Sequence, residues 1–455
     1  MDVLTLARIQ FGGTIAFHYI YPPLSIGLAV LLVIMEATWL KTRNPVYHQM
    51  ARFWTKVFAL TFAIGVATGI VMEFEFGTNW ATYSRYVGDV FGSALAAEGI
   101  FAFFLESGFL AVLLFGWDKV SRGWHFFSTC MVCLGAHFSA VWIVVANSWM
   151  QTPAGYHIVG QGMHARAEIT DFWQVVFNPS SMDRLFHTLC GAWQTGAFLV
   201  ISVGAWYVLK NKFTDFARAS LRIGLTVGLV ASLLQLGSGD SSARGVAKNQ
   251  PAKLAAFEGL YNTTSNAPLT LIGWVDEKNE KVIGLQWPGL LSLLVHRNLH
   301  TPVTGLNDFL PGDRPPVKAS FIFFHGMVGI GFALIGITAL GCFYLWRKVL
   351  FQKRWMLWVL VFSALGPQIG NQLGWFAAEV GRQPWIVYGL LRTPEGLSAV
   401  VKANVVLTSL ILFTVIYFLL FTVFIYLLND KIRHGPDEAD LKPAGKLALP
   451  KRPNT

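Results

Sequence analysis

Nine long apolar runs constrain this chain more than any other feature of its sequence. About 20 mostly apolar residues in a helix span the roughly 30 Å hydrocarbon core of a bilayer. Runs of about that length or longer lie at 13–40, 54–75, 92–116, 125–149, 185–209, 219–238, 320–346, 355–378 and 403–428. Charged residues make up only 13% of the chain, about half the roughly 25% of a soluble domain. We therefore expect an all-α membrane protein, a bundle of nine transmembrane helices, and exclude a water-soluble enzyme.

The Lys and Arg residues orient this bundle. The loops after helices 1, 3, 5 and 7, together with the tail, carry twenty of them, whereas the short loops on the other side carry six. Positive residues concentrate on the cytoplasmic side of bacterial membrane proteins. The N-terminus is therefore predicted outside and the C-terminus in the cytoplasm, and the net charge of +10 needs no nucleic-acid partner. The first run is too long for a cleavable signal, so we expect a retained helix.

These expectations divide the chain into four segments. Helices 1 to 6 occupy residues 1–238, an external loop 239–319, helices 7 to 9 residues 320–430, and a solvated cytoplasmic tail 431–455.

Polar side chains within the predicted spans fall into one layer. Ionisable groups are expensive inside a membrane and are functional hypotheses by default. Five metal-capable residues on five helices are predicted in the outer part of the bilayer: His18, Glu98, His187, Met327 and Glu379. Taken singly, each His could serve an interhelical hydrogen bond, the Met could fill space, and each Glu could mark a proton path. Together they indicate a metal or haem layer.

Neighbouring residues sharpen two of these positions. Pro22 lacks an N–H and so frees the carbonyl of His18, which predicts a kink there. Gly191 and Gly196 follow His187 and permit close approach of either a macrocycle or another helix.

Two further pairs of residues leave alternatives open. His325 and Met327 are two positions apart, about 200° around a helix, so only one of them can face a given partner. Glu98 and Glu106 are eight residues apart, about 12 Å along a helix. That spacing suits a proton relay from the cytoplasm, although Glu106 could instead be hydrogen-bonded to Ser139 or Asn147.

Several motifs carry a family resemblance that covers nearly the whole chain. They are RIQFGGTIAFHYIYPPL near the start, VMEFEFGTNWATYSRYVGDVFGSALAAEG before FFLES, SAVWIVVANSWMQTP, the His187 segment and, most specific of all, GWFAAEVGRQPW at 374–385. With them the chain resembles subunit I of the bacterial cytochrome bd-type quinol oxidases, including the cyanide-insensitive branch. Its external loop is similar to the short version found in that family.

The resemblance implies a set of haem ligands. His187 and Met327 would be the axial ligands of a low-spin haem b, Glu379 the ligand of a high-spin haem b, and His18 the ligand of the oxygen-reducing haem d, with Glu98 beside it. The same ligands could hold a third haem b in place of haem d.

The resemblance also implies the residues that handle protons and quinol. Glu106, Ser139 and Asn147 match the family's proton route, and Lys253 and Glu258 of AKLAAFEG match residues used in quinol oxidation. Arg382 joins this catalytic set beside Glu379. Without the motif, Lys253 and Glu258 would be interpreted as a solvated charge pair.

Two positions depart from the family pattern. His325 stands where the family commonly has Arg, and His137 where it has Asn. His325 is therefore a rival haem ligand, and His137 is assigned only a buried hydrogen bond.

The function implied is that of the haem-bearing catalytic subunit of a terminal quinol:oxygen oxidoreductase in the bacterial inner membrane. Ubiquinol or menaquinol would be oxidised on the outer side, and dioxygen reduced to water with cytoplasmic protons. The expected partner is subunit II of the oxidase, with or without a small single-helix subunit. The alternatives are a haem-b electron-transfer subunit that serves another acceptor and a proton-coupled membrane transporter.

Overall fold

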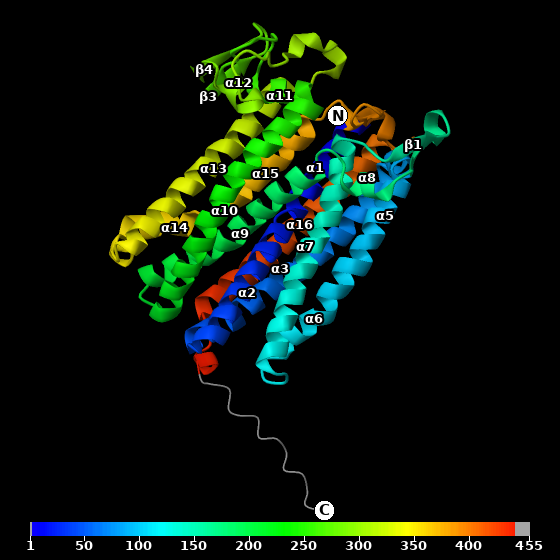
Figure 1. Ribbon diagram of the computed structural model, residues 1–455. Helices are drawn as coiled ribbons and strands as arrows, with labels where there is room; N and C mark the ends of the chain where they lie inside the picture. The colour runs from blue at the N-terminus through cyan, green and yellow to red at the C-terminus, as the bar shows by residue number, and fades with distance from the viewer. Residues whose placement is uncertain (1, 442–455) are drawn as a thin grey trace, which may run out of the picture.

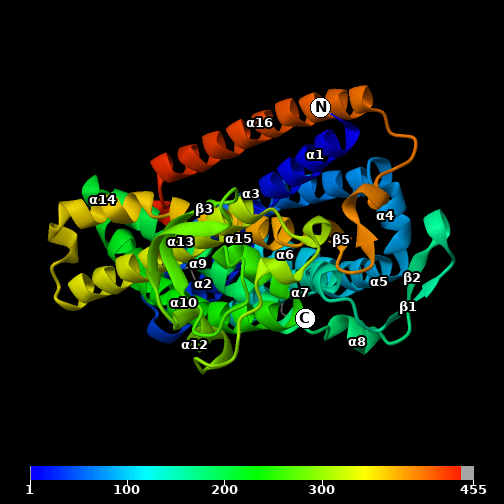
Figure 2. The same ribbon diagram turned by 90° about the horizontal axis from the view of Figure 1, so that it is seen from above.

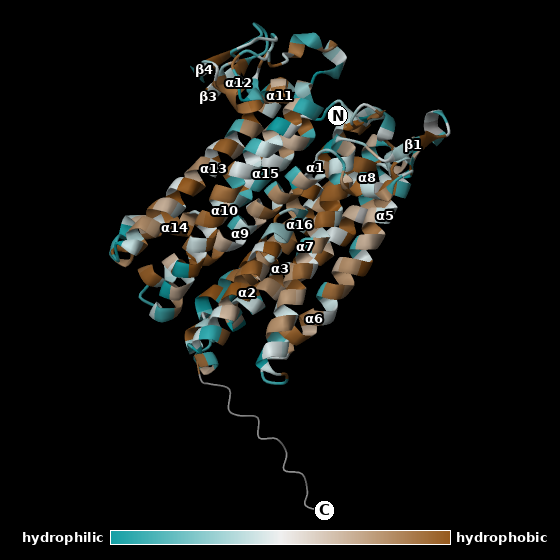
Figure 3. Ribbon diagram, viewed as in Figure 1, coloured by the Kyte–Doolittle hydropathy of each residue, from teal (hydrophilic) through white to brown (hydrophobic). Residues whose placement is uncertain are grey.

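Long helices that run side by side make up most of the chain in the computed structural model (Figure 1), which describes residues 2–441 apart from the side chains of Glu73, Phe76 and Met163. The N-terminus and residues 251–313 lie at one end of the bundle, and α16 (Ala403–His434) ends at the other. Apolar residues dominate the middle of the helices and hydrophilic ones collect at the ends (Figure 3). This is the pattern of a multi-pass membrane protein.

Eight segments of the described chain are long and apolar enough to cross a membrane. Besides α16 they are α1 (Val3–His18) with α2 (Tyr21–Thr42), α3 (Pro45–Thr78), α5 (Gly88–Glu98) with α6 (Phe104–Phe115), α7 (Arg122–Gln151), α9 (Ser181–Leu209), α10 (Thr214–Asn249) and α13 (Val317–Trp346).

The ninth expected span, 355–378, is divided in two. It comprises α14 (Arg354–Phe362) and α15 (Leu365–Val380), which are separated at residues 363–364. At 1.5 Å per residue, neither piece alone spans 30 Å. The nine-helix count therefore stays a prediction.

The predicted kink near Pro22 is present. Residues 19 and 20 separate α1 from α2, and two amide side chains of α15 bond to carbonyls around the break. Gln372 donates to the carbonyl of Ala16 at 2.7 Å, and Gln368 to that of Ile20 at 3.1 Å. Buried carbonyls need such partners, so α15 stabilises the bend that ends α1 at His18.

A second irregularity lies between the two glutamates of the expected relay. One π-helical turn, Gly99–Phe103, joins α5 to α6 and follows Glu98 directly. Such insertions are rare and frequently mark functional sites.

Four helices, α9, α10, α13 and α15, pack in a closed ring, since each contacts the next and α15 returns to α9. Seen from above, α9, α10 and α13 lie toward the left and α5 toward the right, with α15 between them (Figure 2). Gly191 packs on the Asn371 side chain of this ring, and Gly196 on the backbone of Gly27 in α2. Both glycines therefore lie at contacts between helices. Of the two interpretations, this is the one that needs no macrocycle.

The helix α10 continues to Asn249, eleven residues past the predicted end of the sixth span at 238, and the boundary of the external loop stays a prediction. The loop contains α11 (Pro251–Glu258), the antiparallel hairpin of β3 (Leu269–Asp276) and β4 (Lys281–Trp287), and α12 (Leu290–His296). Smaller elements cover the same end: α4 (Ala81–Tyr86), α8 (Phe172–Val176), the pair β1 (Tyr156–Val159) and β2 (Arg166–Ile169), and the pair β5 (Trp385–Val387) and β6 (Leu391–Arg392).

The start of the tail is not solvated as expected. Gln49 of α3 donates to the carbonyl of Asp437 at 2.8 Å, and Arg52 pairs with Asp440 at 3.0 Å. Asp440 is buried. This segment therefore docks on α3, and the rest of the predicted tail, 442–455, lies outside the described residues.

Candidate functional site

Glu379, near the end of α15, is the centre of a polar network that joins α15 to α7. Its carboxylate pairs with Arg382 and accepts hydrogen bonds from Asn147 at 3.1 Å and Gln151 at 3.3 Å. Both amides lie on α7, one turn apart. The buried Arg382 keeps Nε and Nη1 without a hydrogen-bond partner among the described residues. An unsatisfied buried guanidinium requires an explanation, and the anionic edge of a cofactor would supply one.

Arg184, on α9, extends this network. It donates to the Asn147 side chain at 2.5 Å and to the Asn147 carbonyl at 3.3 Å. In the sequence, Arg184 is one of the six Lys and Arg residues counted in the short loops. Its place three residues before His187, within the motif-matched segment, was the available signal.

Lys253 of α11 is joined to the same network from the external side. Its ammonium donates to Gln151 and Gln250 at 2.5 Å each. Because Gln151 also donates to Glu379, one amide connects α11 to the carboxylate of Glu379. Lys253 is only 3% exposed, and burial, with the charges of Arg184 and Arg382, holds its pKa well below the usual value.

Glu258, at the end of α11, is also buried, and its Oε2 has no hydrogen-bond partner among the described residues. Burial raises its pKa to about 8, although a hydrogen bond from the backbone of Thr270 opposes the shift. The carboxyl group is therefore poised to exchange a proton near neutral pH. Burial of both residues shows that the solvated charge pair is the wrong interpretation of Lys253 and Glu258.

His18 ends α1 and faces α3. Its Nδ1 lies 2.9 Å from the hydroxyl of Thr68, and its ring packs on Gly69. Nε2 has no hydrogen-bond partner among the described residues. This arrangement, with one nitrogen held and the other available, is the usual one for a histidine that binds a metal.

The members of the proposed low-spin pair lie on opposite helices of the ring. His187 projects from α9 toward α10, where Ser238 lies 2.9 Å from Nδ1 and the Gln235 amide 3.0 Å from Nε2. Met327 projects from α13 onto Gly374 of α15, where a Cβ would come within 2.8 Å of its sulfur. The Gln235 amide would have to turn away before Nε2 could bind a metal.

His325 is directed elsewhere. Its Nδ1 lies 3.0 Å from the carbonyl of Phe321, and its Nε2 lies 2.9 Å from that of Thr270 in β3. Both nitrogens thus face backbone oxygens, one of them in the external loop. This geometry favours Met327 over His325 as a ligand. His137 accepts a hydrogen bond from Trp193 at 3.0 Å, and this bond is part-buried where a buried one was expected.

Glu98 and Glu106 both face α7. Ser139 donates to Glu98 at 2.6 Å, and Glu106 packs so closely on Gly135 that a Cβ there would come within 2.9 Å of its own. Asn147 and Ser139 therefore bond to Glu379 and Glu98, not to Glu106. Ser139, Asn147 and Gln151 therefore form a row of polar residues along α7, at intervals of eight and four residues.

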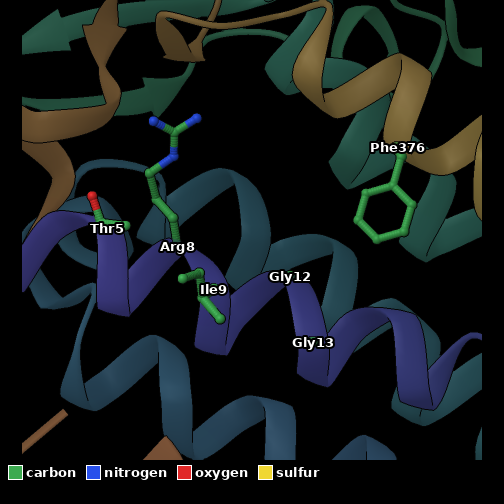
Figure 4. Close-up of a pocket in the computed structure, with 6 residues that line it drawn as sticks. All are labelled: Thr5, Arg8, Ile9, Gly12, Gly13 and Phe376. Atoms are coloured by element: carbon green, nitrogen blue, oxygen red, sulfur yellow. The ribbon is translucent and has the colours of Figure 1, made fainter. Parts of the chain in front are cut away.

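A cavity of about 460 Å³ opens between α1 and α15 (Figure 4). Thr5, Arg8, Ile9, Gly12 and Gly13 line one side, and Phe376, one turn from Glu379, points in from the other. A Cβ added at Gly12 or Gly13 would meet nothing within 4 Å. Arg8 supplies a cation to the lining of this open cavity. The sequence analysis missed Arg8, although it begins the motif RIQFGG.

Within residues 2–441, no three His, Cys, Asp or Glu side chains are grouped to hold a metal ion. Isolated donors are what a haem requires, because the porphyrin supplies four nitrogens and the protein only one or two axial ligands.

Comparison with known proteins places these residues in a family context. Residues 6–436 match the family model described as cytochrome bd terminal oxidase subunit I. The chain is 39% identical to cytochrome bd ubiquinol oxidase subunit 1 of Bacillus subtilis, covering 96% of this chain and 95% of that one. It is 35% identical to cytochrome bd-II ubiquinol oxidase subunit 1 of Escherichia coli, covering 96% and 97%. Among solved structures, bd oxidase from Geobacillus thermodenitrificans matches with a TM-score of 0.89 and 31% identity, covering 96% of this chain and 99% of that chain.

Proposed function

Because the chain belongs to the cytochrome bd terminal oxidase subunit I family, it is the catalytic subunit of a membrane-embedded quinol oxidase, and we propose that it oxidises quinol at its external loop and delivers the electrons to dioxygen. Family membership favours this function over a transporter. It also implies haem cofactors and a subunit II partner.

The observation that carries the proposal is the bridge through Gln151. This amide donates to Glu379 at 3.3 Å and accepts from Lys253 at 2.5 Å. Lys253, one of the two residues proposed to act on quinol, and Glu379, a proposed haem ligand, are thus parts of one hydrogen-bonded network.

At the external loop, the two buried residues have complementary tasks. Quinol oxidation releases two protons, and Glu258 can accept one of them because its pKa lies near 8. Lys253 can stabilise the developing quinolate, since its ammonium is fixed by two amide oxygens.

Four side chains would hold the haems. His187 and Met327 would ligate a low-spin haem b, Glu379 a high-spin haem b, and His18 the haem at the oxygen site, either d or b. Bound haem supplies one-electron transfer and an open coordination position for dioxygen. Arg382 and Arg8 have the charge needed to neutralise propionates, and Thr68 would fix the His18 ring through Nδ1.

Protons for water would reach this layer from the cytoplasm along α7. Glu106 lies deeper in the bundle than Glu98, and both contact the same row of α7 residues, Gly135 and Ser139. In the predicted orientation the N-terminus is outside, so quinol protons leave on the outer side while substrate protons enter from the inner side. Each charge moved in this way works against about 2.3 kcal/mol per 100 mV.

A visible absorption spectrum of the purified complex, reduced with dithionite, tests the proposal. We expect low-spin and high-spin haem b bands, with a chlorin band in the red if the oxygen site holds haem d. Low-spin haem b alone would identify an electron-transfer subunit, and a spectrum without a Soret band would overturn the proposal.

A further inference from the structure

The β3–β4 hairpin of the external loop has two unlike faces. Toward the protein it presents Thr270 and Val275, each 3% exposed, and Val282. These residues cover the end of α11, where Thr270 bonds to Glu258 and Val282 packs on Gly259.

The outward face is apolar along almost its whole length. The strand register pairs Leu269 with Trp287, Ile272 with Leu285 and Trp274 with Ile283. Both partners of the second and third pairs, and Trp287 of the first, are at least half exposed, up to 76% for Ile272. A sheet that faces water on one side normally carries polar residues there, and an apolar patch of this kind marks a contact surface.

The hairpin lies along the outer turns of the membrane helix α13. At its charged tip, Glu277 accepts a hydrogen bond at 3.1 Å from the backbone of Lys318 in the first turn of α13. At its base, the Thr270 carbonyl lies 2.9 Å from Nε2 of His325, seven residues farther along. Seven residues are about 10 Å of helix. The base of the hairpin therefore lies about 10 Å deeper along the bundle than the tip.

The polarity of the hairpin residues changes along the same direction, from base to tip. The deeper part carries the three apolar pairs, whereas the tip carries Glu277, Lys278, Glu280 and the pair Asp276–Lys281. The neighbouring α13 belongs to a segment long and apolar enough to cross a membrane, and its Ile322, between Lys318 and His325, is 40% exposed. The apolar outer face of the hairpin thus lies beside an exposed apolar residue of a candidate membrane span.

We propose that the outward face of the β3–β4 hairpin inserts into the interfacial region of the bilayer on the side of the external loop. Tryptophan is enriched at this depth, and Trp274 and Trp287 are both on the inserted face. A two-stranded hairpin has unpaired edge groups, which the hydrated headgroup layer can satisfy and the hydrocarbon core cannot. The hairpin thereby anchors the external loop to the bilayer. The hairpin residues that cover Glu258 are then held at the lipid surface.

A photo-crosslinking experiment tests this insertion. The photoreactive residue p-benzoylphenylalanine replaces Ile283 in the intact complex, reconstituted in vesicles of phosphatidylethanolamine and phosphatidylglycerol, and adducts are identified by mass spectrometry. Asn279, exposed at the hairpin tip, is the matched control. We expect lipid adducts at position 283 in several-fold excess over position 279.

Two results would overturn the proposal: adducts at 283 with another polypeptide, which would show a protein interface, or no excess of lipid adducts over 279, which would place this face in water. Position 285 serves as a second site if the Ile283 replacement fails to assemble. The inference rests on the chain being a membrane protein and not on its redox chemistry. A colourless complex with lipid adducts would therefore contradict only the proposed function.

Discussion

Two carboxylates face α7 from opposite ends of the bundle, and they differ in how completely the polar groups around them are hydrogen-bonded. Near the start of α7, the buried Glu36 accepts from Thr129 at 2.5 Å and lies 2.7 Å from Nδ1 of His125. Nε2 of His125 lies 3.3 Å from the carbonyl of Leu113. Near the end of α7, the network around Glu379 leaves two nitrogens of Arg382 without partners among the described residues.

The comparison separates polar clusters that hold helices together from polar clusters that can bind a ligand. A fully bonded polar cluster holds helices together and has little capacity left for a ligand. An incompletely bonded one carries a desolvation penalty that a bound group can relieve. We therefore propose that Glu36 and His125 serve helix packing and that the residues around Glu379 serve cofactor binding.

Replacing a histidine tests this distinction with the largest expected effect on the haem spectrum. His187→Ala should abolish the low-spin haem b signal and quinol oxidation with it, because an axial ligand is lost. His125→Ala should leave the reduced spectrum unchanged. Loss of the low-spin signal in the His125 variant alone would reverse the assignment.

The choice between the two α13 residues can be sharpened in the same spectrum. Met327→Ala should weaken the low-spin band or convert it to high spin, since one of two axial ligands is removed. His325→Ala should retain the band, because both ring nitrogens of His325 face backbone carbonyls. The opposite pattern would make His325 the ligand.

Glu106→Gln should slow oxygen reduction by about 10²-fold, the usual size of a proton-transfer contribution, while haem reduction by quinol changes little. Stopped-flow absorbance separates the two steps. Glu36→Gln is the matched control and should slow neither. Equal slowing of both steps in the Glu106 variant would remove the relay.

Quinol oxidation at limiting quinol should rise with pH around pH 8. Glu258 holds its proton below its pKa of about 8, so the basic form that accepts the quinol proton increases about tenfold from pH 7 to 9. Initial rates of haem reduction across this range measure the effect. Glu258→Gln should flatten the profile, and an unchanged rise in that variant would assign the base elsewhere.

The smallest expected effect is on stability. Glu36→Gln should lower the free energy of unfolding by about 1–3 kcal/mol, because it disturbs a buried network without removing a cofactor ligand. Thermal unfolding of the complex, followed by circular dichroism, should show a lower Tm with an unchanged haem spectrum. A lost haem would mean that the cluster of Glu36 and His125 supports the redox site directly.

Much of the site was accessible from the sequence because membrane burial makes polar residues conspicuous. His18, Glu98, His187 and Glu379 stand out against apolar runs, and the kink at Pro22 follows from its missing N–H. Arg184, Arg8 and Gln151 did not stand out, since residues near helix ends look like ordinary loop or interface groups.

The alternation of inward and outward residues along the hairpin strands was equally hard to recognise in the sequence of the external loop. The sequence analysis assigned no hairpin there, and the burial of Lys253 and Glu258 depends on contacts with α7, α10 and β3 that lie far away in the chain.

The sequence alone determined that this chain is a helical membrane protein and which polar residues its spans contain, because the price of placing polar groups in lipid acts on each span separately. Only the tertiary structure decided which partners those groups have. It directed His325 to Thr270, Asn147 to Glu379 and Lys253 to Gln151, since hydrogen bonds depend on distances between helices that no single helix specifies.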